Sequence, residues 1–164
     1  MTTTIEQYPL ERAKIVKKFI ASMINWILLL ALIGAISHFV LNNSISSIAA
    51  FALIIVAAAW EWVNQTKYYE SYFYDATNDF LEIRKGWITP REVTLPYEKL
   101  QDVYVDQDLL DRLMGLYDVH VSSATIMSGM EAHIDGVNSA NAKAIKALLL
   151  EKIKSKKSRV TGYD

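Results

Sequence analysis

Two histidines in the C-terminal half are the side chains best suited to metal chemistry. His120 alternates with apolar residues along one segment, and His133 and Asp135 lie on the next one. If these segments pair and turn near residues 127–128, His120 approaches Asp135, and His133 approaches Ser122. Two imidazoles and a carboxylate can bind zinc. An ordinary polar strand face explains the same residues, and their spacing matches no metal-ligand motif, so we predict no metal site.

Hydroxyl groups near the histidines raise a second possibility, which is nucleophilic catalysis. Ser122, Ser123 and Thr125 lie close to His120 in the sequence. The sequence has no G-x-S-x-G elbow and no cysteine, and its six glycines do not form a phosphate-binding loop. We therefore predict no catalytic residue, no cofactor and a function in binding.

Carboxylates gather in one short stretch of the chain. Asp106, Asp108 and Asp111 have Glu98 and Asp102 nearby. Such a cluster can bind calcium, but the loop glycine and the bidentate glutamate of a calcium loop are missing. Asp108 also suits the N-cap of a helix. We predict that Asp106, Asp108 and Asp111 contact a partner.

Five cations within eight residues form a basic region near the C-terminus: Lys152, Lys154, Lys156, Lys157 and Arg159. Each cation beside an anionic bilayer contributes about 1 kcal/mol of attraction. A solvated, disordered terminus is the alternative interpretation. If the domain binds lipid headgroups, the predicted contacts are Arg84, Lys85, Lys154, Lys156, Lys157 and Arg159.

An apolar segment precedes all of these groups and would hold them at a membrane. From Phe19 to Trp60, 42 consecutive residues carry no charge. A soluble helix of that length needs charge on its wet face, so the segment indicates lipid. Residues 19–41 and 45–63 are each long enough to cross a hydrocarbon core of about 30 Å. The polar residues 42–44 between them predict a helical hairpin over residues 19–63.

The flanking charges predict the orientation of this hairpin. Four cations lie in the N-terminal segment, residues 1–18, and Lys67 follows the second span. The connection at residues 42–44 carries no charge, so the positive-inside rule places both termini in the cytoplasm. A signal peptide cleaved near residues 35–37 is the alternative, but a second apolar stretch follows immediately.

Residues 67–154 are enough for one small domain, which residues 155–164 follow as a basic tail. Alternating patterns predict strands at residues 68–74, 80–87, 93–97, 100–105, 117–121 and 131–137. A short helix is predicted over residues 108–115, with Leu109, Leu110 and Leu113 on one side. A last helix begins near Ser139, with an apolar stripe of Ala142, Ile145, Leu148, Leu149 and Ile153. Strands followed by one helix indicate an α+β domain or a small barrel.

Four segments in this order resemble the bacterial pleckstrin-homology-like family of membrane-flanked domains, the YdbS-like group. They are residues 81–88 (LEIRKGWI), 95–103 (LPYEKLQDV), 107–116 (QDLLDRLMGL) and 134–137 (IDGV). The preceding helix pair is also similar to the family. The resemblance implies a PH-like antiparallel barrel or sandwich capped by a C-terminal helix, and it implies no reaction.

The predicted function is a non-enzymatic, membrane-anchored PH-like interaction module at the cytoplasmic face of the plasma membrane. Besides the lipid bilayer, its expected partner is another protein or a second copy of the chain. The alternatives are an anionic lipid-headgroup sensor and an accessory subunit of a membrane enzyme or transporter. The net charge of −1 provides no basic field, so no nucleic acid is expected.

Overall fold

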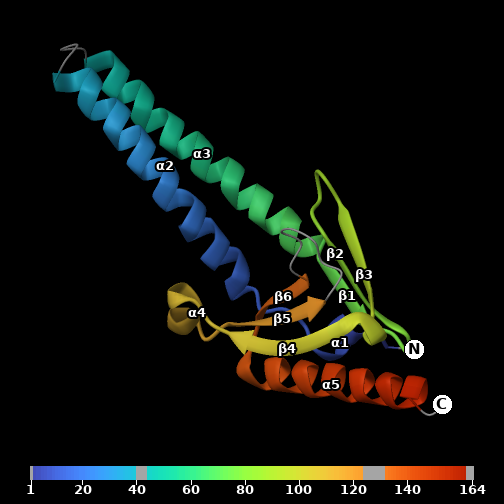
Figure 1. The fold of residues 1–164 in the computed structure, drawn as a ribbon. Helices are drawn as coiled ribbons and strands as arrows, with labels where there is room; N and C mark the ends of the chain where they lie inside the picture. The colour runs from blue at the N-terminus through green and yellow to red at the C-terminus, as the bar shows by residue number, and fades with distance from the viewer. Residues whose placement is uncertain (1, 40–43, 124–131, 162–164) are drawn as a thin grey trace. The chain divides into compact units, whose positions relative to one another are not determined.

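The computed structural model describes residues 2–39, 44–123 and 132–161. The chain forms two compact units. The first consists of Met1–Lys14 and Ser71–Asp164 and contains the β-sheets, and the second is Ile15–Glu70 and contains most of the two long helices (Figure 1).

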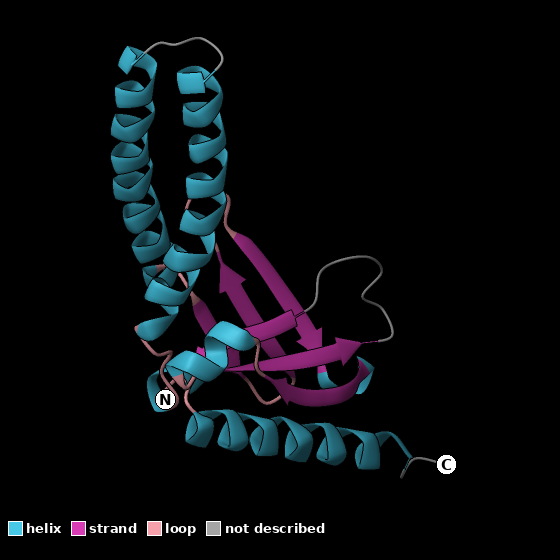
Figure 2. Cartoon of the chain, turned by 90° about the vertical axis from the view of Figure 1, so that its left-hand side faces the viewer, coloured by secondary structure: helices cyan, strands magenta, loops and turns pink. Residues whose placement is uncertain are grey.

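The two long helices, α2 (Ala13–Phe39) and α3 (Ser44–Glu70), run antiparallel beside each other (Figures 1 and 2). Both are long and apolar enough to cross a membrane. In a polar contact between them, Trp26 Nε1 donates to Glu61 Oε1 at 3.4 Å. The predicted helix pair is confirmed. Of its predicted connection, residues 42–43 lie outside the described part of the chain, and the third residue already begins α3.

Helix α3 is longer than the sequence pattern indicated. The second span was predicted to end at residue 63, and residues 68–74 were predicted to form a strand. The helix instead continues to Glu70, and the first strand begins at Phe73. The first half of that predicted strand is therefore wrong. An existing helix gains one hydrogen bond for each residue it adds, so it extends through aromatic residues that would otherwise favour a strand.

Two three-stranded antiparallel sheets follow, with strand orders β1-β2-β3 and β4-β5-β6. The strands are β1 (Phe73–Ala76), β2 (Phe80–Lys85), β3 (Arg91–Pro96), β4 (Leu100–Asp106), β5 (Tyr117–Ser123) and β6 (Ala132–Val137). Pro96 ends β3, which is an edge strand of the first sheet, a position that tolerates proline because proline cannot donate to a neighbouring strand. The two sheets do not close into one barrel.

The helix α5 (Ser139–Thr161) lies along the second sheet and contacts β4, β5 and the 3₁₀ turn Tyr97–Lys99 (Figure 2). Asn138 caps it by accepting the Asn141 N–H at 2.8 Å. The buried side chains include Leu81, Ile83 and Leu95 of the first sheet, Val103, Val119, Val121 and Ile134 of the second, and Ala142, Ile145, Leu149 and Ile153 of α5. The predicted α+β class and the predicted stripe on the last helix are confirmed, although Leu148 is only half-buried.

The N-terminal segment is built into the same unit as the sheets. It contains the short helix α1 (Thr4–Gln7). The Thr4 hydroxyl donates to Asp75 Oδ1 at 2.7 Å and accepts the Ala76 N–H at 2.9 Å. Further along, the Glu11 N–H donates to the Gly136 carbonyl at 2.8 Å. Residues 4–11 therefore connect β1 with the end of β6, which no local pattern in the sequence indicated.

Two tyrosines of this unit have buried hydroxyl groups. Tyr97 donates to the Thr77 carbonyl at 3.0 Å, and Tyr74 donates to the Tyr8 carbonyl. Burial is the main cause that raises the pKa of both phenols. An electrostatic interaction with Tyr8 raises the pKa of Tyr74 further, and the carboxylates of Asp75 and then Asp79 raise the pKa of Tyr97 further. A raised pKa favours the neutral phenol in the folded state.

These tyrosines predict a loss of stability at alkaline pH. A tyrosine in the unfolded chain titrates near pH 10. The stability that these two neutral phenols contribute to the folded state is therefore present below about pH 10 and is lost as the pH rises above it. Each phenol contributes at most about 1.4 kcal/mol per pH unit to this loss. Thermal melting between neutral and alkaline pH should show a smaller decrease in Tm for Tyr97→Phe than for the parent. An equal decrease in both proteins would show that Tyr97 has its ordinary pKa.

Candidate interaction surface

A short helix, α4 (Leu109–Met114), follows β4 and is capped at both ends. Asp108 Oδ1 accepts the Asp111 N–H at 2.8 Å, and Asp111 Oδ2 accepts the Asp108 N–H at 3.1 Å. Gly115 ends the helix at φ +68°, and the Leu116 N–H donates to the Asp111 carbonyl at 2.9 Å. A helix of six residues is too short to be stable alone. The caps and the buried Leu116 side chain therefore hold it in place.

Two leucines of α4 face solvent. Leu109 and Leu113 are each 75% exposed, whereas Leu110 is half-buried. Residues four positions apart share one helix face, so the two exposed side chains form a single apolar patch. Asp106, Asp108 and Arg112 are also exposed and provide charges near it. An apolar centre with a charged rim is the usual composition of a protein interface.

The three aspartates predicted to contact a partner have different environments. Asp106 and Asp108 are exposed. The Asp108 side chain already serves as the helix N-cap, as the sequence predicted. Asp111 is only 1% exposed, because its carboxylate completes the capping box. We expect Asp106 and Asp108 to be accessible to a partner, while Asp111 positions the helix.

The two histidines lie opposite each other on β5 and β6, and their rings stack at 5.3 Å between centroids. His120 Nε2 lies 3.1 Å from Asp106 Oδ1, and His133 Nε2 lies 3.1 Å from Asp135 Oδ1. The expected approaches of His120 to Asp135 and of His133 to Ser122 are therefore wrong. The predicted turn at residues 127–128 and Thr125 lie outside the described residues.

Asp106, Asp118 and His120 bring three ligand atoms within 4.8 Å of one another. By donor type, such a set can hold a divalent cation. Here Asp118 Oδ1 accepts the Gly136 N–H at 2.7 Å, and Asp106 lies against His120. Because these contacts explain the arrangement of all three side chains, we assign no metal to them.

A buried ion pair joins the N-terminal segment to β6. Lys14 Nζ is 3.2 Å from Asp135 Oδ2, and the two side chains are 2% and 3% exposed. The ammonium also lies 3.7 Å from the centroid of the Tyr72 ring, and the Tyr72 hydroxyl donates to the His133 carbonyl at 2.7 Å. Gly136 has φ +76°, and a Cβ there would lie 2.8 Å from the Lys14 side chain. The glycine thus makes room for the lysine.

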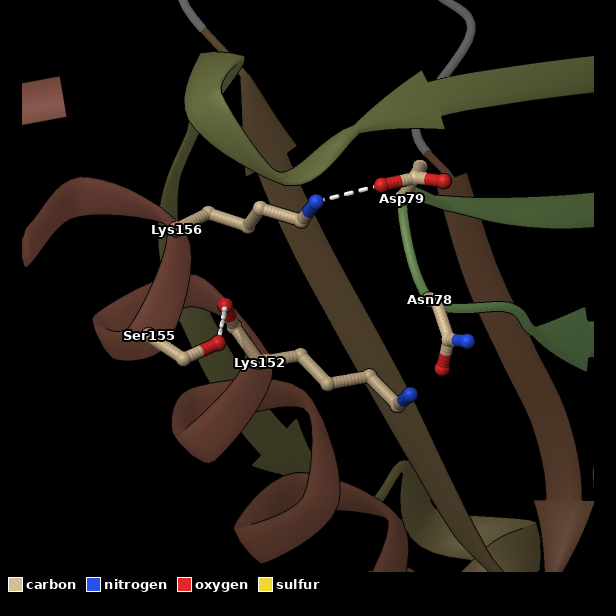
Figure 3. A pocket seen from close by; sticks show the side chains of 5 residues that line it. All are labelled: Asn78, Asp79, Lys152, Ser155 and Lys156. Atoms are coloured by element: carbon tan, nitrogen blue, oxygen red, sulfur yellow. Dashed lines mark hydrogen bonds and ion pairs between the residues drawn. The ribbon is translucent and has the colours of Figure 1, made fainter. Parts of the chain in front are cut away.

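A polar pocket of about 500 Å³ lies between α5 and the β1–β2 turn, lined by Asn78, Asp79, Lys152, Ser155 and Lys156 (Figure 3). Lys156 and Asp79 form an ion pair across it. Figure 3 shows the Lys152 and Asn78 side chains extending toward the same space. Because a carboxylate already balances one of its two ammonium groups, the pocket has limited attraction for an anion.

The cations predicted to bind lipid headgroups are not gathered in one place. On α5, Lys154 and Lys157 are exposed outside the pocket, and the Arg159 side chain lies outside the described residues. This helix continues to Thr161, so the predicted basic tail begins as helix.

The other two predicted headgroup contacts lie at the end of β2. Arg84 Nη2 is 3.0 Å from Glu82, and its Nε is 3.1 Å from Glu92. Lys85 is the last residue of the strand, at the start of the turn to β3.

Comparison with protein families gives a match. The family model described as "Bacterial PH domain" matches residues 10–153 of the chain, which includes both long helices and both sheets. Neither the curated proteins nor the solved structures compared with the chain gave a match.

Proposed function

Because the chain belongs to the bacterial PH domain family, we propose that it is a non-enzymatic binding module anchored in the plasma membrane. Helices α2 and α3 cross the bilayer with both termini in the cytoplasm. The α4 surface, formed by Leu109 and Leu113 with Asp106 and Asp108, holds another protein or a second copy of the chain.

The exposure of the two α4 leucines carries the binding part of the proposal. Leaving two large apolar side chains in water is unfavourable, and here they share one face of a helix whose ends are fixed. A rigid surface loses little conformational entropy when it binds, which favours affinity. The aspartates beside it would select a partner with complementary charge.

The side chains of α2 and α3 support membrane anchoring. Leu28, Ile48 and Phe51 are each at least 65% exposed, although they lie in apolar helices. A soluble unit would bury such side chains, whereas lipid solvates them.

Lipid-headgroup sensing is the less supported alternative. Of its predicted contacts, Arg84 and Lys156 already pair with carboxylates. An anion would have to compete with those carboxylates.

Removal of the two leucines tests the α4 surface. The double substitution Leu109→Ser/Leu113→Ser should weaken association by about tenfold or more, because the two leucines form the apolar centre of the proposed interface and truncating a hot-spot residue costs about 2 kcal/mol or more. Its effect on folding should be small, since both side chains are exposed. Leu150→Ser is the matched control, because Leu150 is an exposed leucine on α5.

Site-specific crosslinking provides the measurement, since the chain has no cysteine of its own. Leu113→Cys, labelled in native membranes with a thiol-reactive photocrosslinker, should give an adduct, which the Asp106→Lys variant should reduce. An adduct of twice the mass of the 18.6 kDa chain identifies a second copy, and any other mass identifies a different partner. The same adducts from Lys143→Cys on α5 would contradict the proposal.

A further inference from the structure

The turn between β2 and β3 presents a second pair of apolar side chains. Lys85 pairs with Arg91 at the last register position, so residues 86–90 form the tip of this hairpin. Trp87 is 39% exposed and Ile88 is 61% exposed. Figure 1 shows the tip at the end of the hairpin away from α5.

The backbone of the tip has a fixed bend. Gly86 has φ +97°, a conformation that other residues rarely adopt. A Cβ at this position would lie 2.6 Å from the Thr89 carbonyl oxygen, so the chain turns back on itself too closely for a larger residue. Trp87 and Ile88 therefore lie at the end of a tightly turned hairpin.

Cations flank this tip, in contrast to the aspartates near the α4 leucines. Lys85 and Arg91 lie on either side of it as cross-strand neighbours. One position further back, Arg84 and Glu92 pair with each other at 3.1 Å, so their charges largely cancel. The net charge next to Trp87 and Ile88 is thus positive.

We infer that the β2–β3 tip inserts into the headgroup region of an anionic lipid bilayer. Tryptophan favours the membrane–water interface, and an exposed isoleucine beside it favours the acyl boundary. Lys85 and Arg91 would then meet lipid phosphates. A tryptophan beside an exposed aliphatic side chain suits the membrane–water interface, and the cations on either side of it complement anionic headgroups. Lipid is therefore the occupant that this tip fits.

The inference rests on the proposed membrane anchoring and is independent of the α4 surface. Helix α3, which contains the proposed second span, ends at Glu70 and β1 begins at Phe73, so two residues separate this helix from the first sheet. A hairpin tethered this closely meets a high effective concentration of lipid, and weak insertion is then sufficient.

Fluorescence of a label at the tip tests the inference on the full chain. Ile88→Cys, labelled with an environment-sensitive fluorophore, is reconstituted into vesicles of phosphatidylcholine and phosphatidylglycerol. Asn78→Cys is the matched control, because Asn78 is exposed in the turn at the opposite end of the same sheet. A lipid-borne quencher should quench the label at residue 88 several-fold more than the label at residue 78. Aqueous iodide should quench the label at residue 88 less than the label at residue 78.

Two further variants separate the apolar and charged contributions. Trp87→Ser should reduce lipid quenching of the Ile88 label in all vesicles. Lys85→Glu/Arg91→Glu should reduce it only when phosphatidylglycerol is present. Three outcomes would overturn the inference. If the protein floats with the vesicles while iodide quenches both labels equally, insertion of the tip is wrong and the anchoring stands. If the label at residue 88 is shielded from both quenchers, the tip contacts protein instead of lipid. If the protein does not float with the vesicles, the anchoring is wrong as well.

Discussion

In the Lys14→Met variant, the free energy of unfolding of the β-sheet unit should be about 3–5 kcal/mol lower than in the parent protein. Removing one partner of a buried ion pair leaves the other charge without compensation in a medium that solvates it poorly. Here the remaining charge would be the Asp135 carboxylate, whose side chain is 3% exposed and which would keep its contacts with His133 and Tyr72 but lose its buried cation. Hydrogen exchange of β6 and α5 peptides, measured by mass spectrometry on the full chain in mild detergent, reports the free energy of opening.

Two further variants separate the ion pair from general effects of substitution. Lys143→Met replaces an exposed lysine on α5 and should leave the exchange rates unchanged. In Lys14→Met/Asp135→Asn both charges are absent, so most of the loss should be recovered. If Lys14→Met exchanges like Lys143→Met, the ion pair contributes little to the stability of this unit.

Local patterns predicted most of the secondary structure because each signal involves neighbouring residues. Alternation predicted β2, and Asp108 with the leucines that follow it predicted α4. The apolar stripe on the last helix also predicted which of its faces is buried. The failure at residues 68–70 occurred where two patterns compete, since an aromatic-rich segment follows a helix that can simply continue.

The surroundings of Lys14 could not be predicted, because they join residues far apart in the sequence. Lys14 was assigned only a charge that orients the hairpin, yet its ammonium lies against Tyr72 and Asp135. The one local signal was Gly136, whose positive φ allows the lysine side chain to pass close to the backbone. A glycine within a strand indicates such a close approach without identifying what approaches.

The histidine contacts depended on a register that the sequence did not determine. Alternation correctly placed His120 and His133 on polar faces, but pairing them required knowing where the hairpin turns. In the structure a register irregularity between Tyr117 and Val119 accompanies the pairing of His120 with His133. A shift of this kind changes every cross-strand neighbour, so the predicted partners were wrong while the predicted strands were right.

The Leu149→Ala variant should lower the free energy of unfolding by about 2–5 kcal/mol, the usual cost of removing a buried leucine side chain. Leu149 is fully buried on α5, whereas its neighbour Leu150 is 42% exposed. Leu150→Ala is therefore a matched control with the same chemistry, and it should cost much less.

The measurement needs the full chain, because residues 4–11 contribute hydrogen bonds to the same unit. Hydrogen exchange in β4 and β5, the strands that α5 contacts, should accelerate in Leu149→Ala. Equal exchange in the two variants would mean that α5 contributes little to the stability of this sheet.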